Sequence, residues 1–420
     1  MKSIKYHLLF AVLLMGSIQN LAQTPDSLDI KIGQMILIGF AGTSVDPGVL
    51  EEVRLGKVGS IIIFEKNIPP ANSFVALKKI IWTYQQAAPV PLFVTIDQEG
   101  GKVNRLKDKY GFPKSITAAA MGKSSNLDSV RFYGQATAST LAGLGINMNF
   151  GPVVDLASNP TNPVIARHGR AFSANEDSVI VFAKEFIKQH RRYGVLTSLK
   201  HFPGHGSSKD DTHLGIADVT NTWEARELKP YKVLIDSGYV DAVMTSHIVN
   251  RKLDRQGNPG TLSIQILDSI LRRELRFNGV IFTDDMQMHA ITKHYGLEEA
   301  IKLAINGGVD IMTFSNNIQG SDERTVDRVH TIIKELVKQG LIKSQRIDES
   351  FNRIMKLKSR LNQYDLSIYY QQALEKSNRE LEEAKRTILL EKKNLASQKM
   401  QPPPEQQPEK KNKKKRKIRN

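Results

Sequence analysis

Eight short apolar segments rich in β-branched and aromatic residues recur along the chain, and their spacing restricts the fold more than any other feature. They lie at residues 35–40, 58–64, 92–96, 146–150, 195–199, 242–245, 279–283 and 309–314. The intervals are long enough for a helix, and several carry helical patterns, at 74–86, 128–144, 177–193 and 298–306. Strands that alternate with helices form a parallel sheet, so the sequence predicts an α/β fold, a closed (β/α)8 TIM-type barrel.

An open, doubly wound sheet is the competing arrangement. It is weakened because no glycine-rich dinucleotide fingerprint follows the first strand and no phosphate loop with Gly-Lys-Ser/Thr occurs. The composition, 40% hydrophobic and 24% charged, is that of a globular protein and excludes wholesale disorder or a multi-span membrane protein. The absence of cysteine excludes disulfides, thiolate metal sites and a cysteine nucleophile.

The two ends of the chain differ from its centre. Residues 1–22 place Lys2 and Lys5 before a short apolar run, which predicts a secretory signal, with a permanent anchor as the alternative. The barrel is expected over 23–362. Residues 363–400 predict an amphipathic helix with an apolar residue at every seventh position, which either docks, simply extends the chain or forms a coiled-coil seam.

The last segment, 401–420, is rich in proline and lysine and carries a net charge of +6 within a chain of +16. It has almost nothing to bury, so we expect it to be disordered. It is either a solvated end or a basic arm that contacts an anionic polymer.

Polar side chains follow six of the predicted strands at their carboxyl ends. They are Asp97, Asp155, Lys200, His201, His247, Asp284, Asp285 and Asn316. The carboxyl ends of barrel strands converge on one mouth, so this agreement predicts an active site there.

Four motifs in this order give the chain a family resemblance. They are Ile96-Asp97-Gln98-Glu99-Gly100-Gly101-Lys102-Val103-Asn104-Arg105, Gly169-Arg170-Ala171-Phe172, Lys200-His201-Phe202-Pro203-Gly204-His205-Gly206 with Asp211-Thr212-His213, and Phe282-Thr283-Asp284-Asp285-Met286. Together they resemble glycoside hydrolase family 3, in its β-N-acetylglucosaminidase branch. The resemblance covers about residues 30–360, and the Lys-His-Phe-Pro-Gly-His-Gly segment is its most specific part.

The resemblance implies catalytic roles for three residues. Asp284 is the implied nucleophile, which forms a covalent glycosyl intermediate, and Asp285 supports it by hydrogen bonding. His213 is the implied proton donor and acceptor, held by Asp211 two residues earlier.

Substrate binding falls, by the same resemblance, to five residues whose charged groups suit sugar hydroxyls: Asp97, Arg105, Arg170, Lys200 and His201. These side chains also suit a salt-bridged barrel rim. Asp155 and His205 fit binding and rim structure equally well.

The resulting expectation is an exported, periplasmic or extracellular retaining exo-β-N-acetylglucosaminidase that acts on peptidoglycan fragments or chitin-type oligosaccharides. No cofactor, no metal and no stable nucleic acid partner are expected, and the oligomeric state stays open. The alternatives are another family 3 activity such as β-glucosidase, a non-catalytic barrel that binds cell-wall glycans, and a metal site built from His201, His205, His213, Asp211 and Asp284.

Overall fold

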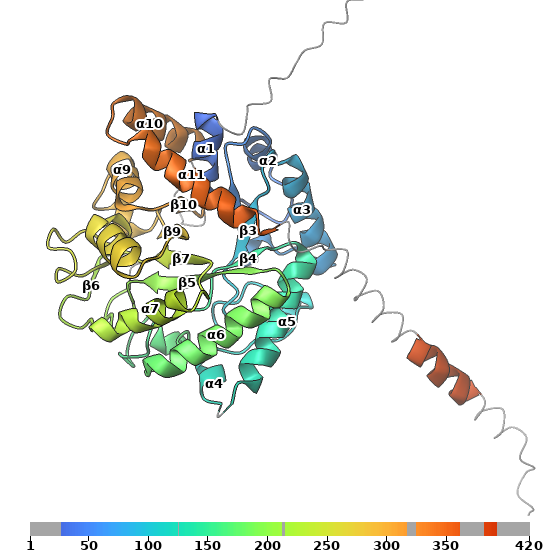
Figure 1. Ribbon diagram of the computed structural model, residues 1–420. Helices are drawn as coiled ribbons and strands as arrows, with labels where there is room; N and C mark the ends of the chain where they lie inside the picture. The colour runs from blue at the N-terminus through green and yellow to red at the C-terminus, as the bar shows by residue number, and fades with distance from the viewer. Residues whose placement is uncertain (1–26, 125, 212–214, 317–324, 362–381, 393–420) are drawn as a thin grey trace, which may run out of the picture. The chain divides into compact units, whose positions relative to one another are not determined.

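The computed structural model describes residues 27–124, 126–211, 215–316, 325–361 and 382–392. Its centre is a closed barrel of parallel strands in the order β1-β10-β9-β7-β5-β4-β3-β2 (Figure 1). The barrel strands are β1 (Ile36–Gly39), β2 (Ser60–Ile63), β3 (Phe93–Ile96), β4 (Met148–Asn149), β5 (Leu196–Phe202), β7 (Ala242–Thr245), β9 (Val280–Asp285) and β10 (Ile311–Phe314). Each overlaps one of the eight segments, although β5 and β9 extend two or three residues past the predicted ends, and the predicted (β/α)8 TIM-type barrel is confirmed.

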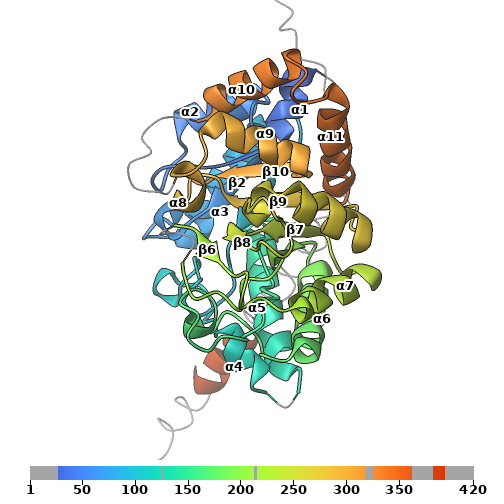
Figure 2. The same cartoon turned by 90° about the vertical axis from the view of Figure 1, so that its left-hand side faces the viewer.

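Helices surround the barrel and cover the outer face of its strands (Figures 1 and 2). They are α1 (Leu28–Gln34), α2 (Pro47–Arg54), α3 (Ser73–Ala87), α4 (Ala118–Gly122), α5 (Asp128–Leu144), α6 (Glu176–Arg192), α7 (Lys229–Asp236), α8 (His289–Thr292), α9 (Leu297–Gly307), α10 (Val326–Lys338), α11 (Ser344–Lys358) and the π-helix η6 (Gln265–Glu274). The four predicted helical patterns correspond to α3, α5, α6 and α9 within one residue at each end.

Local sequence explains where these helices begin. The Asp46 carboxylate accepts the amides of Gly48 and Val49 at the start of α2, and Pro47 occupies the first helical position. The Asn175 side chain caps α6 in the same way by accepting the Ser178 amide. Each cap satisfies amides that have no partner within the helix.

Aromatic side chains fill the barrel interior. The Phe282 ring meets the Phe150 ring edge to face at a centroid distance of 5.2 Å and the Phe93 ring at 6.2 Å. All three side chains are fully buried, so the interior of the barrel is a packed core and not an open channel.

The opposite end of the barrel is crossed by α11, which lies on the other side of the barrel from α8 in Figure 2. The Lys358 ammonium group donates to the Gln34 side chain at 2.6 Å and to the Gly59 carbonyl at 2.8 Å, and both acceptors precede barrel strands. α11 is therefore fixed at the amino ends of the strands.

Two features were not predicted from the sequence. A small sheet pairs β6 (Ala217–Asp218) with β8 (Ile248–Val249), and η6 is a π-helix. The strands of the sheet are two residues long, and such short pairs depend on tertiary contacts rather than on a local pattern.

The chain divides into a barrel unit, residues 1–364, and a second unit, residues 365–420. Within the second unit, residues 382–392 are helical and expose Ile388, Leu389 and Leu390, in agreement with part of the helix predicted over 363–400. The rest of that helix, the signal segment 1–22 and the tail 401–420 lie outside the described residues.

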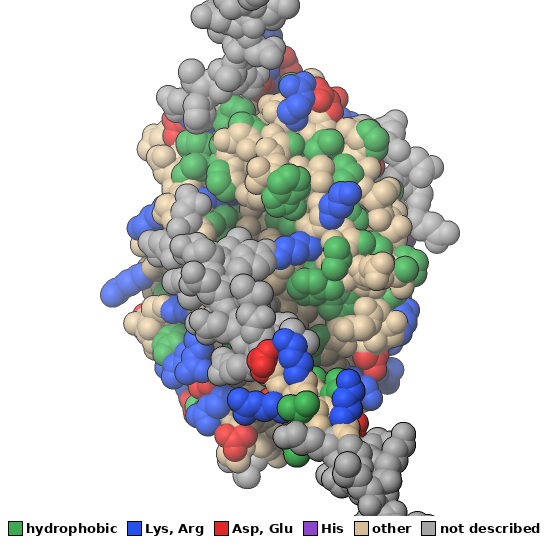
Figure 3. Space-filling view, turned by 90° about the vertical axis from the view of Figure 1, so that its right-hand side faces the viewer, with side chains coloured by type: hydrophobic (Ala, Val, Ile, Leu, Met, Phe, Trp, Pro, Cys, Tyr) green, Lys and Arg blue, Asp and Glu red, His purple; other side chains and the backbone are tan. Residues whose placement is uncertain are grey.

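The surface of the barrel unit combines basic and apolar side chains. On the face shown in Figure 3, hydrophobic side chains lie between Lys and Arg residues. Helix α3 contributes two exposed hydrophobic side chains to the surface, Val75 and Trp82. None of the helices in the described parts of the chain has the length and apolar character that crossing a bilayer requires.

Candidate active site

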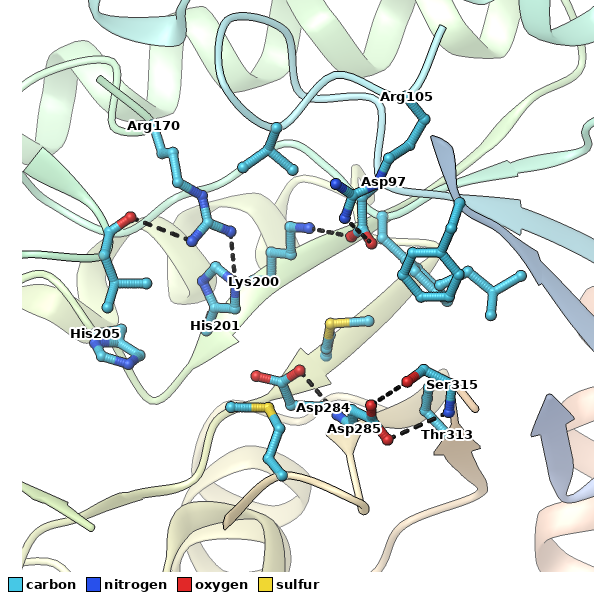
Figure 4. Close-up of a pocket in the computed structure, with 17 residues that line it drawn as sticks. Asp97, Arg105, Arg170, Lys200, His201, His205, Asp284, Asp285, Thr313 and Ser315 are labelled. Atoms are coloured by element: carbon cyan, nitrogen blue, oxygen red, sulfur yellow. Dashed lines mark hydrogen bonds and ion pairs between the residues drawn. The ribbon is translucent and has the colours of Figure 1, made fainter. Parts of the chain in front are cut away.

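A pocket of about 380 Å³ opens at the carboxyl ends of the strands (Figure 4). Its lining includes Asp97, Arg105, Arg170, Lys200, His201, His205, Asp284, Asp285 and Ser315. Six of the eight predicted site residues therefore meet in one cavity. Asp211 is half-buried and is not among the lining residues, and His213 lies outside the described residues.

One wall of the pocket is a buried network of alternating charge. The Lys200 ammonium group lies 2.6 Å from the Asp97 carboxylate and 2.7 Å from the Glu99 carboxylate. Glu99 also binds the Arg170 guanidinium through two hydrogen bonds of 2.8 Å, and Arg105 reaches Asp97 at 3.3 Å. This network holds Asp97, Lys200 and Arg170 in fixed positions around the cavity.

The network also determines the charge of the Asp97 carboxyl. Burial alone would raise its pKa, but the ammonium of Lys200 and the guanidinium of Arg105 outweigh burial and lower the pKa below its ordinary value. Asp97 is therefore an ionised acceptor at neutral pH, suited to the hydroxyl groups of a ligand.

His201 is held from both sides of its ring. Its Nε2 lies 3.1 Å from the Arg170 guanidinium and its Nδ1 lies 2.6 Å from the Asp155 carboxylate. Because a guanidinium only donates, Nε2 accepts and Nδ1 carries the hydrogen that is donated to Asp155. Asp155 thus sets the tautomer and the orientation of His201, although it does not line the pocket itself.

Asp284 and Asp285 follow each other at the end of β9 but have different surroundings. The Asp285 side chain accepts hydrogen bonds from the Ser315 hydroxyl and from the Gln287 amide at 3.0 Å, and burial raises its pKa to about 6. Asp284 lines the cavity and accepts the Asp285 amide at 2.8 Å. In Figure 4 it lies across the open centre of the pocket from Asp97, Lys200 and Arg170.

A buried carboxyl group, that of Glu227, holds the segment that follows β5. The Glu227 side chain accepts the Gly206 amide at 3.1 Å, and burial raises the pKa of Glu227 to about 7. Gly204 has a φ of +117°, and a Cβ there would lie 2.8 Å from Glu227, so only glycine fits. Burial also lowers the pKa of His205 to about 4.

Three supporting residues were not predicted from the sequence: Glu99, Asp155 as the partner of His201, and Ser315. Glu99 lies within the first quoted motif, but only the position of Arg170, 71 residues away, shows its function. Among the described residues, no three His, Asp or Glu side chains converge as the ligands of a metal ion would.

Comparison with known proteins agrees with this site. Residues 27–357 match the Glycosyl hydrolase family 3 N terminal domain. The chain is 29% identical to a beta-hexosaminidase A of Pseudoalteromonas piscicida, with 83% of this chain and 63% of that protein covered. It is 33% identical to a beta-hexosaminidase of Tolumonas auensis, with 68% and 84% covered.

Solved structures give the same result. A glycoside hydrolase family 3 beta-N-acetylglucosaminidase from Paenibacillus sp. is similar with a TM-score of 0.74 and 32% identity, over 80% of this chain and 63% of that one. A beta-N-acetylhexosaminidase from Beutenbergia cavernae has a TM-score of 0.71 and 26% identity, over 79% and 98%. The chain thus spans somewhat less than two thirds of the Pseudoalteromonas and Paenibacillus proteins. With a family 3 domain over most of its length and a polar pocket at the mouth of its barrel, this chain belongs to glycosyl hydrolase family 3.

Proposed function

We propose that the protein is a retaining exo-β-N-acetylglucosaminidase that removes terminal β-linked GlcNAc from a glycan. The observation that carries the proposal is the placement of Asp284 opposite Asp97, Lys200 and Arg170 in a pocket at the mouth of a family 3 barrel. The names of the relatives with similar sequence and fold, beta-hexosaminidase and beta-N-acetylglucosaminidase, support the choice of substrate.

In this proposal the charged wall holds the terminal sugar. Asp97 is an ionised acceptor, while Lys200, Arg105 and Arg170 are donors, so the set suits vicinal hydroxyls and an acetamido oxygen. Because these groups are already fixed by one another, little side-chain entropy is lost when the sugar binds.

Asp284 acts as the nucleophile. Its carboxylate attacks the anomeric carbon, the bond to the leaving oxygen breaks, and a glycosyl ester forms that water later hydrolyses with net retention. Asp285 is the poorer nucleophile, because its two oxygens are engaged as acceptors of hydrogen bonds from Ser315 and Gln287. The backbone amide of Asp285 fixes the Asp284 carboxylate instead.

The proton for the leaving oxygen comes from His213, with Asp211 as its partner, as the Asp-x-His spacing suggests. The same imidazole then accepts a proton from the attacking water. Glu227 supports this assignment indirectly, because it anchors the Gly206 end of the segment that leads to Asp211.

The cellular setting is also proposed from the sequence. Residues 1–22 direct export, so the enzyme acts in the periplasm or outside the cell on peptidoglycan fragments or chitin-type oligosaccharides. The basic tail, 401–420, contacts an anionic polymer there.

The activity is tested with the p-nitrophenyl β-N-acetylglucosaminide and β-glucoside, with and without chelator. We expect turnover of the N-acetyl substrate alone, no effect of chelator, and loss of turnover in Asp284→Ala. Asp236→Ala is the matched control because this carboxylate is exposed and pairs only with Lys232 in the described structure. Preferred cleavage of the glucoside would contradict the proposed substrate, and full activity of Asp284→Ala would contradict the proposed nucleophile.

A further inference from the structure

A second pocket, of about 310 Å³, lies at the end of the barrel opposite the candidate active site, and we call it the basal pocket. It is enclosed by α11, the end of α7, the start of β7 and the turn between η6 and β9. Its lining includes four cations and one carboxylate: Arg276, Arg353, Lys356, Arg360 and Asp241. The charge of its lining is therefore strongly positive.

The two buried carboxylates near this pocket, Asp241 and Asp310, already have their full number of ion pairs and hydrogen bonds. Asp241 binds Arg191 at 3.0 Å and Arg360 at 2.8 Å, and it also accepts the amide and hydroxyl of Thr197. Asp310 is shared by three arginines, Arg272, Arg346 and Arg353, and accepts an amide and a serine hydroxyl in addition. A carboxylate offers about four lone-pair sites, so neither has capacity for a further cation.

Two of the four lining cations have no counter-charge. No ion pair or side-chain hydrogen bond joins Arg276 or Lys356 to any described residue within bonding distance, and both side chains are exposed at the pocket. Among the described residues, the Arg360 guanidinium makes one ion pair, at 2.8 Å to Asp241. Several N–H donors thus remain for an anion, in a concave site where like charges repel one another.

The backbone of Arg276 gives a second, independent observation. Arg276 has a φ of +57° directly after the last turn of η6, a position that favours glycine. A left-handed conformation costs a non-glycine residue free energy, so glycine at this position would make the folded state more stable. The arginine side chain at this strained position is therefore better explained by a ligand than by stability.

Apart from Asn278 and the glycine Gly279, the rest of the lining is apolar. Phe277, Ile235 and Leu357 form the wall beside the cations, and the Phe277 side chain is almost fully buried. The volume also exceeds what a single inorganic anion fills. We propose that the basal pocket binds a small organic dianion, a phosphate monoester whose apolar body lies against this wall and whose charged end meets Arg276, Lys356 and Arg360.

The ion pairs that attach α11 to the barrel do not explain all of the cations in and around the basal pocket. They explain Arg272, Arg346 and Arg353, which converge on Asp310. They leave Arg276 and Lys356 unexplained, because neither touches a described carboxylate. The proposal rests on these two side chains and is independent of the proposed glycosidase function, since the pocket lies at the other end of the barrel.

Calorimetric titration with phenyl phosphate at pH 7.5 and low salt tests the proposal. We expect saturable binding at one site with a dissociation constant below about 1 mM, and weaker binding of inorganic phosphate, which lacks the apolar body. The variant Arg276→Gln/Lys356→Gln should bind phenyl phosphate at least about tenfold more weakly. The control Arg255→Gln/Lys188→Gln also removes two exposed charges, elsewhere on the surface, and should change the affinity less than about twofold.

A second variant separates ligand binding from fold stability. Arg276→Gly relieves the left-handed strain, so its melting temperature should equal or exceed that of the wild type while its affinity for phenyl phosphate falls. The proposal is overturned if phenyl phosphate shows no saturable binding, if the double variant and its control bind equally, if inorganic phosphate binds as tightly, or if Arg276→Gly lowers the melting temperature and leaves affinity unchanged.

Discussion

The buried Glu99 carboxylate offers a quantitative test of the charged wall of the active site. It neutralises Arg170 and Lys200 at once, through contacts of 2.7 to 2.8 Å, and its side chain is only 4% exposed. In Glu99→Gln the amide keeps the size of the side chain, but its NH2 group faces a cation and two buried positive charges lose half of their compensation.

Removing one member of a buried ion pair typically destabilises a protein by about 3–5 kcal/mol. For a domain of roughly 340 residues the entropy of unfolding is about 0.7 kcal/mol per degree, so the melting temperature should fall by about 4–7 °C. Because Arg170 and Lys200 line the pocket, kcat/KM should fall as well.

The pH dependence of this effect has a definite sign. Burial opposes ionisation of Glu99, but Arg170 and Lys200 outweigh burial and hold its pKa well below 4.5. The stabilisation is therefore present above the ordinary pKa and is lost only as the pH falls through the lower, folded-state pKa. The difference in melting temperature between wild type and Glu99→Gln should be constant from pH 6 to pH 8.

Glu51→Gln is the matched control, because Glu51 pairs with Arg54 at the exposed surface of α2. Differential scanning calorimetry of both variants measures the two shifts. We expect no measurable shift for Glu51→Gln, since exposed pairs contribute little. Equal melting temperatures for the two variants would refute the argument that Glu99 neutralises the buried wall.

Three further predictions concern single side chains. Asp155→Asn should lower kcat/KM about 10- to 100-fold at unchanged fold, measured by steady-state kinetics, because one of the two oxygens that accept from His201 and His205 becomes an NH2 donor and the His201 tautomer is no longer fixed; unchanged kinetics would contradict this. Ser315→Ala removes a hydrogen bond that lowers the pKa of Asp285, so this pKa should rise by about 0.7 pH unit, measured by NMR titration of the carboxyl, and a downward shift would contradict the assigned hydrogen bond. Burial lowers the pKa of Lys358 well below 10.5, so the folded state binds fewer protons at this side chain than the unfolded state does. From neutral pH to pH 10 the wild type should therefore gain stability relative to Lys358→Met, by up to about 1.4 kcal/mol per pH unit. Urea unfolding of both proteins at pH 7 and pH 9.5 measures this gain, and an equal stability difference at the two pH values would refute the prediction.

The barrel could be predicted because its signals are local. Each strand is a short apolar run and each main helix has a continuous pattern, so β3 and α5 were predicted within one residue of their bounds. Asp97, Lys200 and Asp284 each follow a predicted strand, and parallel strands in a barrel end on the same side. The sequence therefore predicted that these three residues lie at one mouth of the barrel.

The supporting contacts could not be predicted because they join residues far apart in sequence. Asp155 meets His201 across 46 residues and Glu99 meets Arg170 across 71, and no local pattern specifies either pair. Burial decides the rest: Glu227 resembles any surface glutamate in the sequence, yet its pKa is raised to about 7 because it is enclosed beneath Gly206.

The most direct test of the proposed mechanism is to trap the glycosyl intermediate. The protein is incubated with a 5-fluoro derivative of N-acetylglucosaminyl fluoride, which slows hydrolysis of the glycosyl ester, and is then digested and analysed by mass spectrometry. We predict one sugar adduct, on the peptide that contains Asp284, and none in Asp284→Ala. An adduct on Asp285 or elsewhere, or turnover of the chromogenic substrate without any adduct, would contradict the assignment of Asp284 as the nucleophile.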